Sequence, residues 1–331
     1  MAVSEIKVCI CGGGSLGHVC AAVMASQGAG VRILSGHPDS WSSTVEATDP
    51  DGKAFRGHLE SVCSSPEKAV AGAEIVLLCV PGYLIEKTLR DIKPFIGSAA
   101  VGTVVSSTGF FFFAHDILGT DARLFGLQRV PYIARVKEYG SSALLLGYKK
   151  SLLAALENLP EGFGKTLEEL LLTPVEIARS YLQVSLTNSN PILHTGRLYS
   201  LFKGRENQVW DHNVLFYREW TDASSQILID MDREFFRLVD ALGVEGIPTL
   251  LDYYESTDAS SLTRKISSIP AFLNITSPMV QVPGGWKADF GSRYFTEDFP
   301  YGLRWIKELA QQNNIETPVI DKVYDWGMNL I

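Results

Sequence analysis

The sequence is poor in cysteine and histidine, the residues on which disulfide-rich and zinc-binding proteins depend. It has five cysteines and six histidines among 331 residues, and all the cysteines fall in the first quarter of the chain. No second cluster of cysteine or histidine completes a zinc site, so we expect no bound metal. Cys9 and Cys11 alternate with apolar neighbours, which places both side chains on one face of a strand. The odd count favours reduced, buried thiols.

Excess positive charge and long apolar runs are also missing. A formal net charge of -8 at pH 7 argues against nucleic acid or an anionic membrane as a partner. No apolar run reaches transmembrane length, and residues 1–6 lack the basic region and cleavage site of a signal peptide. The 46% hydrophobic and 20% charged residues are typical of globular proteins. We therefore expect a cytoplasmic protein of two domains, each with its own core.

Glycine is concentrated at one informative place near the N-terminus. An apolar strand over residues 6–11 runs into a glycine-rich turn, and a helix follows from Leu16 to Gly28. The turn consists of Gly12, Gly13, Gly14, Ser15, Leu16 and Gly17. In such a turn glycines permit a tight exit from the strand, a close backbone approach to a pyrophosphate at the helix N-terminus, and close packing of helix on sheet. The pattern predicts an NAD(P) or flavin dinucleotide site; the competing interpretation is a glycine loop without a ligand.

The first half of the chain alternates apolar strands with helical stretches, the pattern of a mainly parallel, doubly wound sheet. Strands are expected over residues 31–34, 74–80 and 101–105, with a polar excursion through 49–52 and a helix from Pro66. The buried run 74–80 ends at Val80 and Pro81. Such strand ends face the ligand crevice of an open α/β sheet, so we include both among the cofactor-binding residues.

The choice between NAD and NADP depends on the end of the second strand. An acidic residue that binds the ribose hydroxyls of NAD is expected about 20 residues beyond the glycines. Ser35 stands there, followed by Gly36 and His37. Without a carboxylate at this place, a 2′-phosphate is not repelled, and Arg32 or His37 can contact it. The sequence therefore favours NADP(H) over NAD(H), without excluding NAD(H).

The second half of the chain is dominated by amphipathic helices. The clearest is expected over residues 216–242, with Gly243 as its stop. Its apolar positions at helical spacing are Leu228, Met231, Phe235, Leu238 and Val239. We expect an α/β Rossmann-type dinucleotide-binding domain over residues 1–178 and an all-α substrate domain over residues 179–331.

Hydride transfer to a substrate also needs an acid or base that titrates near neutral pH. Among the histidines, His18 falls beside the expected phosphates and His37 follows the second strand. His194 is placed differently, because Pro191 can start a helix and Asn190 can cap it, which puts His194 about one turn into the helical domain. On spacing alone, a catalytic histidine and a hydrogen-bonded structural histidine are equally good interpretations.

Arg293 and Asp298 form a second candidate pair. Their separation does not place them on one helical face, so they need not be a surface ion pair. A guanidinium suits a substrate carboxylate, and an aspartate can orient a histidine and favour its imidazolium form. A structural salt bridge in a loop explains the same residues, and taken alone they favour that interpretation.

Together and in this order, these segments resemble the opine dehydrogenase family, which includes octopine and nopaline synthases and N-(1-D-carboxylethyl)-L-norvaline dehydrogenase. The family pattern has a glycine turn, a Pro-Tyr/Trp-x-x-Arg loop, an Asn-Pro-x-x-His segment and an Arg-x-x-x-x-Asp loop. In this chain they are residues 12–17, 131–135 and 190–194, and Arg293 with Asp298. The resemblance spans nearly the whole chain, and the last two segments are its specific part.

The resemblance implies a reversible, NAD(P)H-dependent condensation of an amino acid with a 2-oxo acid such as pyruvate, through an imine, in a cleft between the two domains. It makes His194 the residue that moves protons and Asp298 the residue that sets its tautomer. It makes Arg293 a clamp for a substrate carboxylate. The substrate-binding residues that we expect also include Tyr132 and Asn190, which belong to the matched segments, and Arg129, which lies in a loop expected to face the cleft. A monomer and a homodimer both remain open.

The chain departs from the family pattern in the segments that face the substrate. Arg129 and Ala134 stand where the family loop often has threonine and cysteine, which help recognise the amino acid in some members. A run of phenylalanine over residues 110–113 replaces a polar segment, and Thr195 stands where proline is common. We expect the phenylalanine run to form a helix in the core or at a domain interface, with the wall of an apolar pocket as the alternative.

Two other functions fit the same plan. A 2-oxo acid or ketopantoate-type reductase shares the Rossmann-plus-helices arrangement and reduces its substrate without an amine. A non-catalytic NAD(P)-binding sensor binds the cofactor without turnover, and leaves His194, Arg293 and Asp298 unexplained.

Overall fold

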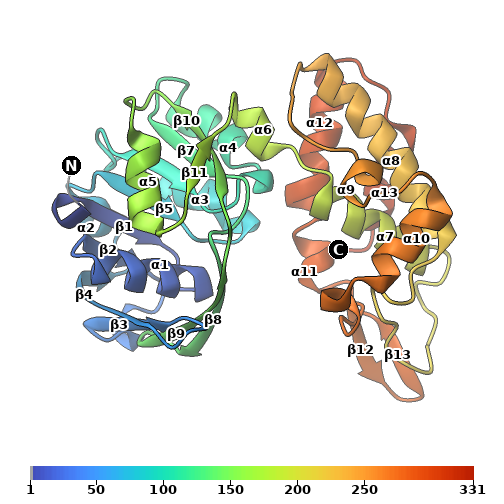
Figure 1. Cartoon of the computed structure of the whole chain (residues 1–331), viewed down its shortest axis with the longest axis horizontal. Coiled ribbons are helices and arrows are strands. Elements are labelled where there is room, and N and C mark those ends of the chain that lie inside the picture. The colour runs from blue at the N-terminus through green and yellow to red at the C-terminus, as the bar shows by residue number, and fades with distance from the viewer. Residues whose placement is uncertain (1–2) are drawn as a thin grey trace. The chain divides into compact units, whose positions relative to one another are not determined.

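The computed structural model describes residues 3–331, and the chain divides into two compact units, residues 1–185 and 186–331 (Figure 1). The first compact unit ends at residue 185, and the domain boundary expected at residue 178 stays a prediction. Helix α6 (Tyr181–Ser185) packs against strand β10 (Leu152–Glu157) and so belongs to the first unit. Within the described residues, no helix is both long and apolar enough to span a bilayer.

The first unit is built on an 11-stranded sheet in the order β11-β10-β7-β6-β5-β1-β2-β4-β3-β9-β8. The other strands are β1 (Lys7–Cys11), β2 (Gly30–Leu34), β3 (Thr44–Thr48), β4 (Ala54–Cys63), β5 (Ile75–Leu78), β6 (Ala100–Thr103), β7 (Leu124–Leu127), β8 (Tyr132–Glu138), β9 (Ser142–Tyr148) and β11 (Val175–Ile177). The run from β7 to β4 is parallel, whereas β3, β8 and β10 each pair antiparallel with a neighbour. The carboxyl ends of the parallel strands therefore meet along one edge of the sheet, where a doubly wound fold binds its ligand.

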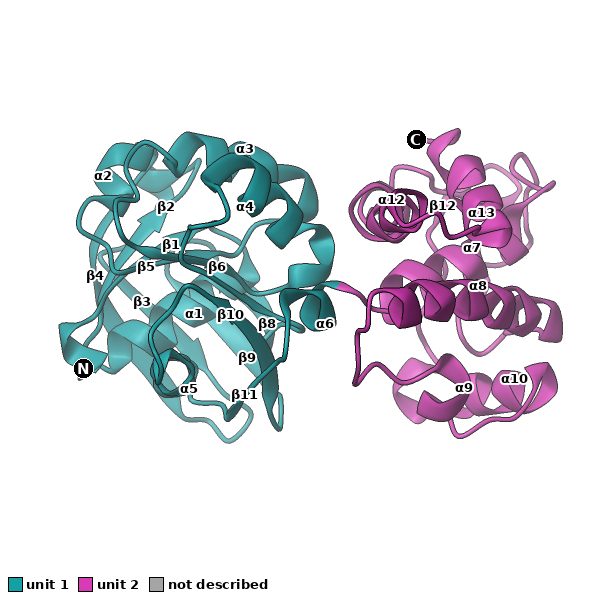
Figure 2. Ribbon diagram, turned by 90° about the horizontal axis from the view of Figure 1, so that it is seen from above, with its two compact units in different colours: residues 1–185 teal, residues 186–331 magenta. Residues whose placement is uncertain are grey.

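Helices cover both faces of this sheet. Figure 2 shows α1 (Ser15–Ser26) and α5 (Phe163–Leu171) on one face, and α2 (Pro66–Val70), α3 (Gly82–Ile92) and α4 (Phe110–Leu118) on the other. Strand β1 supplies both cores by alternation: Val8 and Ile10 join the cluster around α1, whereas Cys9 and Cys11 join the cluster around α3 and α4. The shared face expected for the two cysteines is confirmed, and both are free thiols. The phenylalanine run opens α4, whose first two rings are fully buried in the core.

Two regions that were expected to be irregular contain strands. In the first, the polar stretch at residues 49–52 is the turn of a hairpin formed by β3 and β4. In β4, Phe55 and Leu59 are buried, whereas Arg56 and His58 face outward. Because the outward face is polar, the sequence did not show that this segment is a half-buried strand. The segment at residues 129–135 runs into β8 and is not a loop throughout.

The second unit is helical, as expected, with one small addition. Its helices are η4 (Ser189–His194), α7 (Thr195–Phe202), α8 (Asp222–Ala241), α9 (Leu250–Tyr253), α10 (Ala259–Ser268), η5 (Pro270–Phe272), α11 (Arg293–Thr296), η6 (Phe299–Leu303), α12 (Arg304–Gln312) and α13 (Pro318–Met328). The addition is a hairpin of β12 (Met279–Val282) and β13 (Gly285–Ala288), which the expectation of an all-α domain omitted.

The long helix α8 organises this unit. Its apolar positions are buried as the spacing predicts, and it ends just before Gly243, whose φ is +62°. It begins at Asp222 and not at residue 216, because the hydroxyl of Thr221 caps it by accepting a 3.2 Å hydrogen bond from the backbone of Ser224. Residues 216–220 are therefore an irregular segment in front of the helix.

Candidate active site

The glycine-rich turn links β1 to α1 with the geometry that its sequence predicts. Gly12 has φ +121°, which L side chains rarely adopt, and a Cβ there would lie 2.6 Å from the carbonyl oxygen of Cys79. A Cβ on Gly17 would lie 2.0 Å from the carbonyl oxygen of Gly12, so only glycine lets the helix pack this closely. At Gly14, in contrast, nothing lies within 4 Å of the Cβ position. The N-terminus of α1, at Ser15 and Leu16, therefore faces open space that suits a pyrophosphate.

A cavity of about 400 Å³ adjoins this turn, within the usual size of a small-molecule site. Its lining includes Gly12, Gly13, Ser35, His37, Val80 and Lys87. It therefore gathers residues from the glycine turn, the end of β2 and the end of β5. Pro81 follows as the residue that precedes α3. The glycines leave room beside the backbone, and the small polar side chain of Ser35 with the imidazole of His37 fits the adenosine and phosphate parts of a dinucleotide.

The end of β2 carries no carboxylate. Ser35 is buried, and its Oγ accepts a 3.2 Å hydrogen bond from the backbone N–H of His37. Arg32, which we considered as a partner for a 2′-phosphate, is engaged elsewhere: its Nε donates to Glu60 at 2.8 Å, and it also bonds the carbonyl of Ala71. The basic side chains that line the cavity are exposed His37 and Lys87 of α3, and Lys87 is ion-paired with Asp91, which lines the cavity as well.

Tyr139 was missed by sequence analysis. It comes from the turn between β8 and β9, and its hydroxyl lies 3.3 Å from Ser35 Oγ. His18 holds this turn in place, because its Nε2 accepts a 2.7 Å hydrogen bond from the backbone N–H of Gly140. Its Nδ1–H then donates to the carbonyl of Gly14 at 2.9 Å. His18 is fully buried, which lowers its pKa, and it is therefore a neutral structural residue.

In the second unit, His194 is the best-organised titratable side chain. It ends η4, and its Nδ1 lies 2.8 Å from Oδ2 of Asp298, which directly precedes η6. Its Nε2 lies 3.0 Å from the hydroxyl of Tyr217, in the irregular segment in front of α8. The rings of Phe216 and Tyr294 face the imidazole at centroid distances of 5.7 and 4.8 Å. Four groups from three separate segments thus surround one histidine.

The partners of His194 define its tautomer. An ionised carboxylate can only accept, so Nδ1 carries the proton that is donated to Asp298. Burial raises the pKa of Tyr217 well above its usual range, so its hydroxyl keeps its proton and donates to Nε2. The neutral ring is then held at both nitrogens, with its basic lone pair at Nε2. This is the arrangement of a general base oriented by a carboxylate.

Comparisons with known proteins agree with both halves of this arrangement. The family of NAD/NADP octopine/nopaline dehydrogenases, alpha-helical domain, matches residues 177–331, and that of NADP oxidoreductases, coenzyme F420-dependent, matches residues 7–108. Octopine dehydrogenase of Pecten maximus is 28% identical over 98% of this chain and 90% of its own length. Tauropine dehydrogenase of Arabella iricolor is 26% identical over 98% of this chain and 91% of its own length.

Solved structures agree. Octopine dehydrogenase with NADH and L-arginine is similar with a TM-score of 0.89 and 26% identity. The same enzyme with NADH and pyruvate gives a TM-score of 0.84 and 25% identity. Each comparison covers 98% of this chain and 89% of the other. The chain belongs to the opine dehydrogenase family. It is an NAD(P)-dependent oxidoreductase that acts on CH–NH bonds.

In this opine dehydrogenase family member, Arg293 is the exposed cation beside the histidine cluster. It starts α11, and the next residue, Tyr294, contacts His194. Its side chain is 82% exposed, and its Nε lies 4.0 Å from Glu297, at the outer limit of an ion pair. Asn190 is also exposed but does not cap the helical turn, which follows Asn188 instead. Asn188 is buried and donates to Asp232 at 2.7 Å.

In the segment that leads into β8, Arg129 is exposed, whereas Tyr132 is buried. Arg129 is exposed and follows the end of β7, at the carboxyl edge of the parallel strands. We had expected Tyr132 to bind a substrate, but its side chain is fully buried. Its hydroxyl donates a 2.6 Å hydrogen bond to the carbonyl of Leu171. Its ring belongs to the core under α1, so its role is structural.

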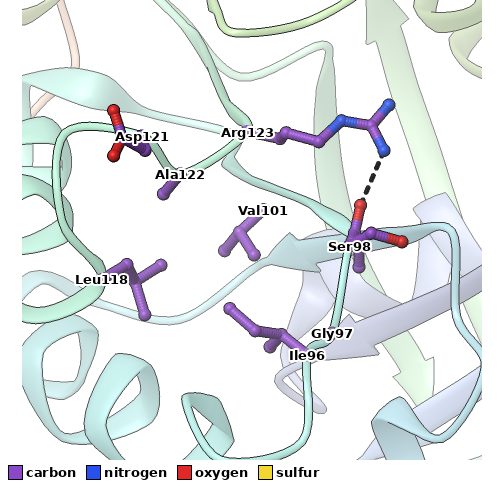
Figure 3. A pocket seen from close by; sticks show the side chains of 9 residues that line it. Ile96, Gly97, Ser98, Val101, Leu118, Asp121, Ala122 and Arg123 are labelled. Atoms are coloured by element: carbon purple, nitrogen blue, oxygen red, sulfur yellow. Dashed lines mark hydrogen bonds between the residues drawn. The ribbon is translucent and has the colours of Figure 1, made fainter.

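A second cavity, of about 300 Å³, lies at the opposite edge of the sheet (Figure 3). It is lined by residues that precede β6 and β7, among them Asp121 and Arg123. Arg123 donates a 2.7 Å hydrogen bond to the carbonyl of Ser98, as the dashed line in Figure 3 marks. None of the residues expected to bind cofactor or substrate lines it. Among residues 3–331, no group of three or more His, Cys, Asp or Glu side chains is arranged to hold a metal ion.

Proposed function

We propose that this chain catalyses the reversible, NAD(P)H-dependent reductive condensation of an amino acid with a 2-oxo acid. The observation that carries the proposal is His194, held at Nδ1 by Asp298 in the helical unit of an opine dehydrogenase family member. The glycine turn and its adjoining cavity in the other unit supply the cofactor site that the reaction needs.

The residues support a sequence of proton movements. His194 takes a proton from the substrate's ammonium group, so that the free amine forms a C–N bond to the 2-oxo carbon. The π pair of the carbonyl moves to its oxygen, which gains a proton from the new N–H group to give the carbinolamine. The proton on His194 then passes to the hydroxyl of the carbinolamine, whose C–O bond breaks with release of water as the nitrogen lone pair forms C=N. Asp298 stabilises the imidazolium between the two transfers. When bound, NAD(P)H supplies the hydride that reduces the imine carbon.

Arg293 is the group that we assign to a substrate carboxylate. Its side chain is exposed and only weakly engaged by Glu297, so a carboxylate can reach its guanidinium. Octopine dehydrogenase has been solved with pyruvate, which makes pyruvate the first 2-oxo acid to test. Exposed Asn190, in the same helical turn as His194, is a further contact in this proposal.

We favour NADP(H) as the cofactor. Buried Ser35 places no negative charge at the end of β2, and exposed His37 lines the cavity together with the ion pair of Lys87 and Asp91. Ser35→Asp is then expected to lower kcat/KM for NADPH more than for NADH, since the new carboxylate repels a 2′-phosphate. A wild-type enzyme with a much better kcat/KM for NADH than for NADPH contradicts this preference.

The amino donor is expected to differ from the L-arginine of the octopine dehydrogenase complex, because Arg129 adds a positive charge at the carboxyl edge of the sheet. We place the reaction in the cytoplasm, which agrees with five free cysteines among the described residues. The oligomeric state in this proposal is a monomer or a homodimer. Analytical ultracentrifugation of the purified protein distinguishes the two.

The test is oxidation of NADPH and NADH across a matrix of 2-oxo acids and amino acids, with each 2-oxo acid also assayed alone. Turnover that needs both substrates, with a secondary amine as product, supports the proposal. Reduction of a 2-oxo acid without an amine indicates a ketopantoate-type reductase instead. Cofactor binding without turnover on any pair indicates a non-catalytic sensor.

A further inference from the structure

The nitrogen of His194 that faces away from Asp298 is already hydrogen-bonded to a second side chain. Its Nε2 lies 3.0 Å from the hydroxyl of Tyr217, while Nδ1 is occupied by Asp298 at 2.8 Å. The rings of Phe216 and Tyr294 also lie against the imidazole, whose side chain is 13% exposed. A proton that enters or leaves Nε2 in this arrangement therefore meets the oxygen of Tyr217 first.

Tyr217 is held firmly at this place. Its ring stacks on Phe272 with a centroid distance of 4.5 Å and an interplanar angle of 27°. Its own segment is fixed by Arg197, whose guanidinium donates to the carbonyls of Phe216 at 3.0 Å and Glu219 at 2.9 Å. Arg197 is 2% exposed, so these hydrogen bonds are shielded from water. Moving this segment aside would break the packing on Phe272 and leave the buried guanidinium with Ser224 Oγ as its one remaining acceptor of three.

We propose that Tyr217 is a catalytic residue that relays the proton between His194 and the reacting oxygen of the substrate. In the forward direction, the Tyr217 O–H proton passes to the departing hydroxyl, the C–O bond breaks, and water leaves. As it does so, the proton on Nε2 of His194 passes to the Tyr217 oxygen, which restores the phenol. The nitrogen lone pair of the carbinolamine forms the C=N bond, so no electrons are gained or lost overall.

The relay avoids a free phenolate. Burial raises the pKa of Tyr217, and neighbouring Asp298 adds to the effect, so a stable negative charge on its oxygen is disfavoured. A concerted transfer, in which one proton arrives as the other departs, never requires that charge. Burial thus makes Tyr217 a poor acid by itself, but it still allows Tyr217 to pass on the proton of His194 in a concerted step.

The proposal rests on the proposed function and is tested by Tyr217→Phe. This variant keeps the ring that stacks on Phe272 and removes only the hydroxyl. We expect kcat to fall by about 10²-fold or more, as for loss of a general acid or base, with KM for both substrates and Kd for NADPH unchanged. The matched control is Tyr199→Phe, which removes the hydroxyl of another buried tyrosine of the same unit and should leave kcat unchanged.

A second measurement needs no variant. In mixtures of H₂O and D₂O, single-turnover rates of the wild-type enzyme should curve with deuterium content, because two protons move together. A straight line, or a Tyr217→Phe enzyme with wild-type kcat, overturns the relay and leaves the proposed function standing. A wild-type enzyme that turns over no substrate pair overturns the proposed function and the relay with it.

Discussion

Asp298 accepts a 2.8 Å hydrogen bond from Nδ1 of His194 across a sequence separation of 104 residues. The side chains are 19% and 13% exposed, so water screens their interaction little. A histidine whose Nδ1–H is held by a carboxylate has a fixed tautomer and a fixed ring orientation. The pair therefore leaves Nε2 as the nitrogen through which His194 exchanges a proton.

Asp298→Asn is expected to lower kcat and to shift the pH profile of kcat. The amide keeps the size of the side chain but removes the carboxylate that accepts the proton of Nδ1, so the tautomer and orientation of His194 are no longer fixed. The profile is measured between pH 5 and 10 beside Asp240→Asn, which removes an exposed carboxylate from α8. Identical profiles for Asp298→Asn and wild type would show that Asp298 has only a structural role.

His194→Ala should reduce kcat by about 10²- to 10⁴-fold, the usual contribution of general acid–base catalysis. Binding of NADPH should stay close to wild type, because the cofactor residues belong to the other unit. Stopped-flow turnover and fluorescence titration with NADPH measure the two effects separately. His58→Ala, at an exposed position of β4, is the control. Near wild-type turnover in His194→Ala would remove His194 from the mechanism.

Arg293→Ala should act mainly on KM for the carboxylate-bearing substrate. Loss of one charge-assisted hydrogen bond costs about 1.5–3 kcal/mol, which corresponds to an increase in KM of about ten-fold or more. The side chain is 82% exposed, so its removal leaves no cavity in the fold. Arg233→Ala removes an arginine of α8 that is also largely exposed, at 72%, and should leave KM unchanged. If Arg293→Ala and Arg233→Ala have equal KM values, Arg293 does not bind the substrate carboxylate.

Asp232 should give the helical unit a pH-dependent stability. Burial raises its pKa to about 6 from an ordinary value of 3.8, even though Asn188 and the backbone of Leu250 each donate to it at 2.7 Å. The raised pKa means that the neutral form is preferred in the fold, so the free energy of unfolding should fall as pH rises from about 4 to about 6. Denaturation at several pH values should show this fall in wild type and lose it in Asp232→Asn. Asp240→Asn, at an exposed position on the same helix, should keep it.

The cofactor half of the site was predictable because its determinants are contiguous. The turn from Gly12 to Gly17 must follow a strand and open a helix, and each condition is visible within one short segment. The positive φ of Gly12 and the close approach at Gly17 are local requirements that only glycine meets. The hairpin of β3 and β4 was not predicted, because its outward residues are polar and its turn resembles a loop.

The substrate half was predictable only in part. His194 and Asp298 are too far apart in sequence for spacing to pair them, and the resemblance to a family did so instead. Tyr217 was hidden inside a predicted helix. The irregular conformation of its segment depends on hydrogen bonds from Arg197 and on the cap at Thr221, which are tertiary and local interactions that apolar periodicity does not encode. Tyr132 shows the reverse error, since a residue in a family motif proved to be part of the core.

Arg129 should make basic amino acids poor donors. It is exposed just beyond the end of β7, where a cationic substrate side chain meets a like charge and a carboxylate gains a charge-assisted pair. Neutral apolar or acidic amino acids should therefore have a higher kcat/KM than basic ones. Arg129→Gln should raise kcat/KM for arginine and lysine and so bring it closer to the value for neutral or acidic donors. The control is Arg123→Gln, at the other end of the same strand, where Arg123 bonds the carbonyl of Ser98. If arginine or lysine is the best donor of the wild-type enzyme, Arg129 does not face the substrate.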